Sequence, residues 1–222
     1  MKNYIKELML LFLLTGATSV NAAPIVLDFE GLDDQESILD FYNGGTSQNG
    51  NSGVDYGVGF SDNTLAVIDA DAGGGGNFGG EPSPDTIMFF LTGSESIMNV
   101  AAGFDIGFSF FYSAINQAGS VGVYDGLNGS GNLLALLEIP LTPFNGAPDP
   151  TGQFSPFVEL GVGFAGTAMS VSFAGVGNQI GFDNITFGSV TPGRNGVPEA
   201  SSIILMGLGL FGLGFTRRQK KA

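Results

Sequence analysis

Short alternations of apolar and polar residues, separated by turn-forming residues, extend from residue 25 to residue 190 of this chain. The segment GFDIGFSFFYSA is the most regular, since Phe104, Ile106, Phe108 and Phe110 would share one face of a strand. Glycine makes up 37 of the 222 residues, and it is interspersed with Phe, Val and Ile rather than with Ser and Gln. This balance predicts a β-protein with many turns, not a disordered chain.

The alternation predicts strands at residues 25–29, 54–60, 64–69, 86–91, 104–110, 120–124, 133–139, 157–164, 168–173 and 179–187. Turn clusters separate them, and the only short segment with a helical period is 36–42. About ten strands at this spacing predict one all-β domain over residues 23–190, an antiparallel β-sandwich of jelly-roll type.

Positive charge is missing from the predicted sandwich. Residues 23–193 contain no Lys or Arg, whereas every Asp and Glu except Glu7 and Glu199 lies there. Such a surface repels nucleic-acid phosphates, so nucleic acid is excluded as a partner.

The residue types that are missing also limit the chemistry. The chain has no His and no Cys, and the sandwich has no Lys or Arg, which excludes a Ser-His-Asp triad, a thiolate site and a Schiff base there. Carboxylates, amides and hydroxyls remain, and these suit calcium or the carboxylate pair of a glycosidase. No closely spaced Glu-x-Asp-x-x-Glu is present, so a non-enzymatic protein is expected. A secreted carboxylate-dependent glycoside hydrolase is the alternative, and a structural matrix protein without a ligand is another.

The two ends predict export and anchoring. Residues 1–22 have Lys2 and Lys6 before an apolar core and small residues before Ala22, as in a signal peptide cut there by signal peptidase. Residues 200–216 are apolar and would span about 25 Å as a transmembrane helix. The basic residues that follow would stay in the cytoplasm and hold the precursor in the inner membrane, with residues 191–196 as a flexible linker.

The C-terminal segment 197–222 resembles a known sorting signal. Val197, Pro198 and Glu199, the Gly- and Leu-rich apolar stretch, and the pair Arg217 and Arg218 resemble the PEP-CTERM signal of Gram-negative bacteria, with Ala200 where a second Pro is usual. The resemblance implies cleavage near Pro198–Glu199 by an exosortase, a membrane-embedded cysteine transpeptidase. It also implies delivery to the cell envelope or extracellular matrix of a host that makes exopolysaccharide or biofilm. Exopolysaccharide is therefore a candidate partner.

Three carboxylates predict a structural calcium site. Asp28 and Glu30 lie two residues apart in the first strand, and Asp183 lies in the last. Jelly-roll sandwiches often place first and last strands side by side, where these carboxylates would repel one another without a cation. Calcium accepts six to eight oxygen ligands and would relieve the repulsion. The alternative is that Asp183 only begins a turn while Glu30 is solvated.

The segments PIVLDFEGL and VGNQIGFDNITFG resemble the terminal strands of calcium-containing carbohydrate-binding β-sandwich modules. Sugar recognition usually relies on aromatic platforms. The candidates are Phe78, in the Gly-rich loop, and the tyrosines Tyr42, Tyr56, Tyr112 and Tyr124, all of which suit a core equally well. The sequence does not assign ligand-binding residues among them.

Overall fold

The computed structural model describes residues 23–144, 146 and 152–193. The signal peptide and the sorting segment expected above lie outside these residues. The elements within them are β1 (Ile25–Leu27), β2 (Val58–Phe60), β3 (Thr64–Ile68), β4 (Thr86–Phe90), β5 (Glu95–Phe104), β6 (Gly107–Ser113), β7 (Gly119–Tyr124), β8 (Leu133–Ile139), β9 (Val158–Gly163), β10 (Ala168–Ala174) and β11 (Gly181–Phe187). Within the described part, no helix is long and apolar enough to cross a bilayer.

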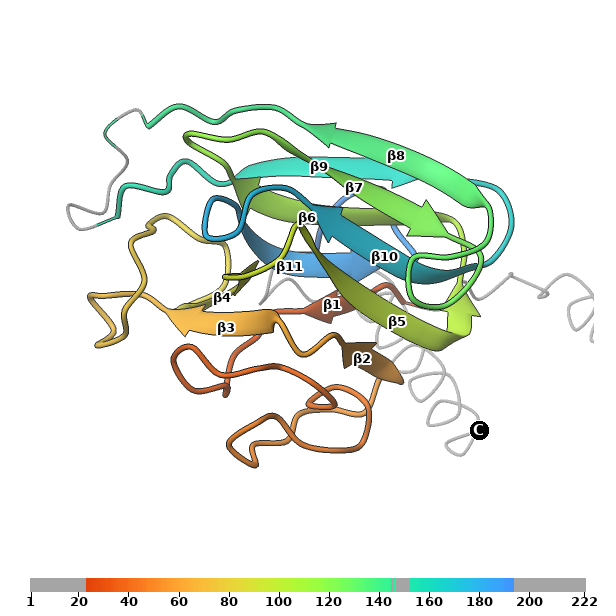
Figure 1. The fold of residues 1–222 in the computed structure, drawn as a ribbon, viewed down its shortest axis with the longest axis horizontal. Helices are drawn as coiled ribbons and strands as arrows, with labels where there is room; N and C mark the ends of the chain where they lie inside the picture. Colours follow the sequence, from red (N-terminus) through yellow and green to blue (C-terminus); the bar gives the residue numbers. More distant parts are fainter. Residues whose placement is uncertain (1–22, 145, 147–151, 194–222) are drawn as a thin grey trace, which may run out of the picture.

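The strands form two packed sheets (Figure 1). Sheet A has the order β3-β4-β11-β6-β9, with β1 also paired to β11, and sheet B has the order β2-β5-β10-β7-β8. The antiparallel pairs are nested: β7 with β8, β6 with β9, β5 with β10 and β4 with β11. Eight strands nested in this way make a jelly roll, which confirms the predicted fold class.

Phenylalanine rings fill the space between the two sheets. Phe108, Phe110, Phe173 and Phe182 are completely buried. The rings of Phe173 and Phe182 lie 4.9 Å apart at 66°, and those of Phe110 and Phe182 lie 5.5 Å apart at 68°. These edge-to-face contacts join β6 and β11 of one sheet to β10 of the other.

The predicted strand 104–110 is wrong, because the chain turns in its middle. β5 ends at Phe104 and β6 begins at Gly107, while Ile106 has φ 72° and is 51% exposed. β5 itself was not predicted. Its inward residues Met98 and Val100 alternate correctly, but Ile97 on the other face disrupts the alternation expected of a half-buried strand.

Three other expectations also differ from the structure. β1 ends at Leu27, before the predicted end of the strand at residue 29. Phe29 is fully buried as expected, but its φ of 63° is not that of a strand residue. β2 covers only the end of segment 54–60, since Val54 is 59% exposed. Residues 36–42 form turns and bridges instead of a helix. The loops between residues 28 and 57 pack their buried side chains against the sandwich, but these side chains follow neither a helix period nor a strand period in the sequence.

Replacing Phe173 with Ala should lower the free energy of unfolding by about 3–5 kcal/mol, because the ring is fully buried between the sheets and leaves a cavity. Leu136→Ala is the control, since Leu136 is 52% exposed on β8 and should change stability by less than about 0.5 kcal/mol. Urea denaturation measures both. Equal losses in the two variants would contradict the assigned core.

Candidate functional site

β11 exchanges neighbours halfway along one of its edges. β4 pairs with it at Phe182, whereas β1 pairs with it from Ile185 to Phe187. The pairing with β6 on the opposite edge shifts between Asp183 and Thr186, and Asn184 has φ 46°. The exchange and this bulge both fall at Asp183 and Asn184.

The Asp183 carboxylate is fully buried in this place. The backbone N–H and the hydroxyl of Ser83 donate to its Oδ2 at 2.8 and 2.9 Å, and the Asn184 N–H donates to its Oδ1 at 2.6 Å. Burial raises the pKa of Asp183 to about 7, against the lowering effect of these hydrogen bonds, and the charge of Glu30 raises it further.

The other two predicted calcium ligands have separate hydrogen bonds. Glu30 Oε1 accepts from the N–H groups of Asp85 and Thr86, at 3.0 and 2.9 Å. Asp28 Oδ1 accepts from the Tyr42 hydroxyl at 3.4 Å and from the Glu30 N–H at 3.3 Å. The first and last strands do pair, and Glu30 is near enough to act on Asp183. Across the described residues, however, no three His, Cys, Asp or Glu side chains are grouped as metal ligands.

The side chain of Asn184 is a further feature of this site. Its amide oxygen and nitrogen are both buried, and neither has a hydrogen-bond partner in the described structure. An amide oxygen is a ligand type that calcium accepts. The sequence did not assign Asn184, because consecutive strand residues normally point to opposite faces and the bulge at this position cannot be read from the residue types.

A pH dependence follows from the raised pKa of Asp183. The folded protein retains this proton up to about pH 7, whereas the unfolded chain releases it near pH 3.8. The stabilisation is therefore complete below about pH 4 and is lost progressively between about pH 4 and pH 7, by about 4 kcal/mol in total. Urea denaturation with a chelator, from pH 3 to pH 8, measures it. Asp183→Asn should show a flatter profile, and parallel profiles would contradict the assignment.

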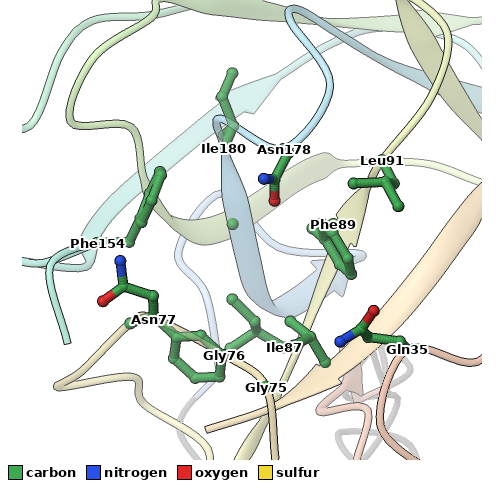
Figure 2. A pocket seen from close by; sticks show the side chains of 13 residues that line it. Gln35, Gly75, Gly76, Asn77, Ile87, Phe89, Leu91, Phe154, Asn178 and Ile180 are labelled. Atoms are coloured by element: carbon green, nitrogen blue, oxygen red, sulfur yellow. The ribbon is translucent and has the colours of Figure 1, made fainter. Parts of the chain in front are cut away.

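A pocket of about 290 Å³ lies beside this site, against the outer side of β4 (Figure 2). Ile87 and Phe89 of β4 and Ile180 beside β11 line it. Val67, Phe78, Ile87 and Phe89 form a buried cluster separate from the main core. The walls come from the Gly-rich loop at residues 75–78 and from Phe154.

Backbone hydrogen bonds fix these walls. The Asn77 carbonyl accepts from the N–H groups of Gln153 and Phe154, at 3.2 and 2.9 Å, and thereby joins two segments far apart in sequence. Gly76 has no room for a side chain, because a Cβ there would lie 2.7 Å from the Ile68 carbonyl oxygen and would overlap the Phe78 ring. Close packing therefore explains part of the glycine content of this loop.

The pocket lining carries amides and no charged side chain. Gln35, Asn77 and Asn178 surround the space together with the apolar residues, and Figure 2 shows the Asn178 amide directed into it. The Asn178 N–H donates to the Phe90 carbonyl at 2.7 Å, while its side chain has no hydrogen bond to any described residue. The pocket thus offers apolar surface and neutral hydrogen-bonding groups together.

The structure separates the aromatic candidates. Phe78 contributes to the pocket, where its ring packs edge-on to Phe157 at 6.2 Å. Tyr42 and Tyr112 are buried in the core, and Tyr124 ends β7 of the other sheet. The three amides were not identified from the sequence, because they belong to loops that only the fold brings together.

Comparisons with known proteins agree with the sorting segment. The PEP-CTERM protein-sorting motif matches residues 196–219. No curated protein sequence matches the chain significantly.

Solved structures with similar folds include the K2 cleaved adhesin domain of Lys-gingipain, with TM-score 0.47, 10% identity, and coverage of 75% of this chain and all of that one. A carbohydrate-binding module from Cellvibrio mixtus lichenase 5A, in complex with cellotriose, has TM-score 0.35 and 13% identity, covering 57% of this chain and 87% of that chain. The CBM22-GH10 modules of Clostridium thermocellum xylanase 10B, in complex with xylohexaose, have TM-score 0.35 and 14% identity, covering 76% of this chain and 30% of that one.

The fold and the motif define a class: exported β-sandwich proteins that are processed at the cell envelope. This chain carries the PEP-CTERM sorting motif of such proteins, and the motif implies an exosortase as the processing enzyme.

Proposed function

We propose that this protein is a non-catalytic surface protein whose uncharged pocket binds a neutral sugar unit of an exopolysaccharide. The observation that carries the proposal is the lining of the pocket, where the rings of Phe89 and Phe154 stand among the amides of Gln35, Asn77 and Asn178. A sugar ring has apolar C–H faces that pack on aromatic rings and hydroxyl groups that hydrogen-bond to amides. The volume of about 290 Å³ suits one or two sugar units.

Binding is favoured over hydrolysis because the pocket lacks acid groups. Glycoside hydrolysis normally uses two carboxyl groups on either side of the bond, about 5–10 Å apart. The side chains that line this pocket are apolar or amide, and Asp183, the nearby group with a raised pKa, is bound by Ser83. The glycoside hydrolase alternative therefore has less support than sugar binding.

The position of the pocket suits display on a surface. Gly181, at the start of β11, lines the pocket, whereas Thr186, near its end, contacts Gly193, shortly before the sorting motif. Five residues of strand separate these points by about 16 Å. A protein attached through its C-terminal segment would thus hold the pocket away from that segment and toward the matrix.

Asn178→Ala should weaken sugar binding about fivefold, the effect of one lost hydrogen bond. Phe154→Ala should weaken it at least as much, because a stacking face is removed. A glycan array identifies the ligand, and titration calorimetry compares the variants. Asn116→Ala is the matched control, since Asn116 is an exposed amide outside the pocket. Failure to bind any neutral glycan, or equal affinities for Asn178→Ala and the control, would refute the proposal.

We also propose that calcium binds beside the pocket and stabilises the junction of β1, β4 and β11. The supporting observation is the buried amide of Asn184, which has no hydrogen-bond partner in the described structure. It follows Asp183 in the chain, and the charge of Glu30 acts on Asp183. Bound calcium would supply the positive charge that residues 23–193 lack.

At 100 times its dissociation constant, calcium should stabilise the fold by about 2.7 kcal/mol, seen as a higher melting temperature than in chelator. Asp183→Ala and Asn184→Ala should reduce or abolish the increase. Asp125→Asn should retain it, because that carboxylate is exposed and is bound by Asn132 in a loop after β7. Identical melting curves with calcium and chelator would exclude the site.

A further inference from the structure

The chain does not leave the sandwich freely after β11. The Gly188 N–H donates to the Gly107 carbonyl at 3.0 Å, and the Ser109 hydroxyl donates to the Ser189 carbonyl at 3.0 Å. Further on, the Gly193 N–H donates to the Thr186 hydroxyl oxygen at 2.9 Å. We call residues 188–193 the exit segment.

The exit segment also packs closely against the sheet. Pro192 is buried, and Gly193 lies so close to β1 that a Cβ on it would overlap the Val26 side chain. The first half of the expected linker 191–196 is therefore attached to the sandwich.

Three glycines make room for this segment on β6 and β9. Gly107 and Gly163 are direct neighbours across the two strands, and Gly161 lies two residues before Gly163. A Cβ on Gly161 would overlap the Val190 carbonyl oxygen, and one on Gly107 would lie 2.7 Å from a Val190 methyl group. None of the three has a positive φ, so at Gly107 and Gly161 space and not backbone conformation requires glycine. A Cβ on Gly163 would lie 3.4 Å from the same Val190 methyl group, in ordinary contact. We call these three residues the glycine groove.

The attachment brings the sandwich close to the sorting motif. Pro198 follows Gly193 by five residues, which reach at most about 18 Å when fully extended. A processing enzyme embedded in the membrane has to bind the residues around Pro198 while the whole sandwich is held at that distance. Release of residues 188–193 would add roughly 20 Å of reach.

We infer that the glycine groove holds the exit segment against the sandwich, and that release of this segment is the step that gives the processing enzyme access to the sorting motif. The inference rests on the motif and on the packing of residues 188–193, and it is independent of what the pocket binds. It predicts that the rate of tail removal depends on the fraction of molecules in which the exit segment has left the glycine groove.

Two changes to the full chain test this in the host, with tail removal followed by pulse-chase and intact mass. Gly161→Ala should displace the exit segment and speed tail removal about fivefold, comparable to the loss of one hydrogen bond from the closed state. Inserting Gly-Ser-Gly-Ser after Gly193 should give a similar increase while the segment stays bound. The two changes combined should be no faster than either alone.

Hydrogen exchange of the full chain reports binding of the segment separately. The amides of Gly188 and Gly193 should lose protection in Gly161→Ala and keep it in the insertion variant. Ser109→Ala is a milder variant if Gly161→Ala folds poorly, since it removes only the hydrogen bond to Ser189. Gly59→Ala is the control, because Gly59 lies on edge strand β2, where its Cβ would approach only Asp40 and Asn43.

Processing of the insertion variant at the wild-type rate would overturn the inference. So would a wild-type rate in Gly161→Ala or Ser109→Ala once exchange shows that the segment is released. Unchanged sugar binding in these variants is expected, because the pocket lies at the other end of β11.

Discussion

The sandwich depends on its last strand. β11 lies inside sheet A, with β6 on one edge and β4 and β1 sharing the other, so sheet A cannot be completed before residues 181–187 are in place. Its Phe182 also joins the ring contacts that hold the sheets together. The register with β6 shifts at the point where β1 replaces β4 on the opposite edge, and the buried Asp183 lies at this point. The buried carboxylate therefore lies where the neighbours of β11 change.

Carboxylates in this sandwich are stabilised by neutral donors, because residues 23–193 contain no Lys, Arg or His. Glu36 is buried and accepts from the Asp33 and Asn49 N–H groups, at 2.6 and 3.0 Å, and from the Asn51 amide at 2.9 Å. Asp183 has a similar number of donors, yet its pKa is raised, since burial outweighs them and Glu30 is near. A cation is proposed at Asp183 because the neighbouring Asn184 amide is buried without a hydrogen-bond partner in the described structure.

One loop connects the two parts of the candidate site. Its residues 75–78 line the pocket, and Ser83 and Asp85 near its end donate to Asp183 and Glu30, respectively. β11 connects the candidate site to the exit segment, because the pocket lies at the start of this strand and the exit segment contacts its end. Ligand binding and attachment can therefore act at opposite ends of one strand without competing for the same residues.

The sequence by itself determined the fold class and the sorting motif. Alternation along strands such as β4 and β10 is a local property, and the motif is read from contiguous residues. The turn at Ile106 and the strand β5 were not predictable locally, because the partners of Met98 and Val100 on β2 and β10 decide which residues face inward. Three further features likewise depend on contacts between residues far apart in the chain. They are the meeting of Gln35, Asn77 and Asn178, the unpartnered amide of Asn184, and the glycine groove under Val190. Only the tertiary structure decides those contacts, since a side chain's type does not specify which distant backbone packs against it.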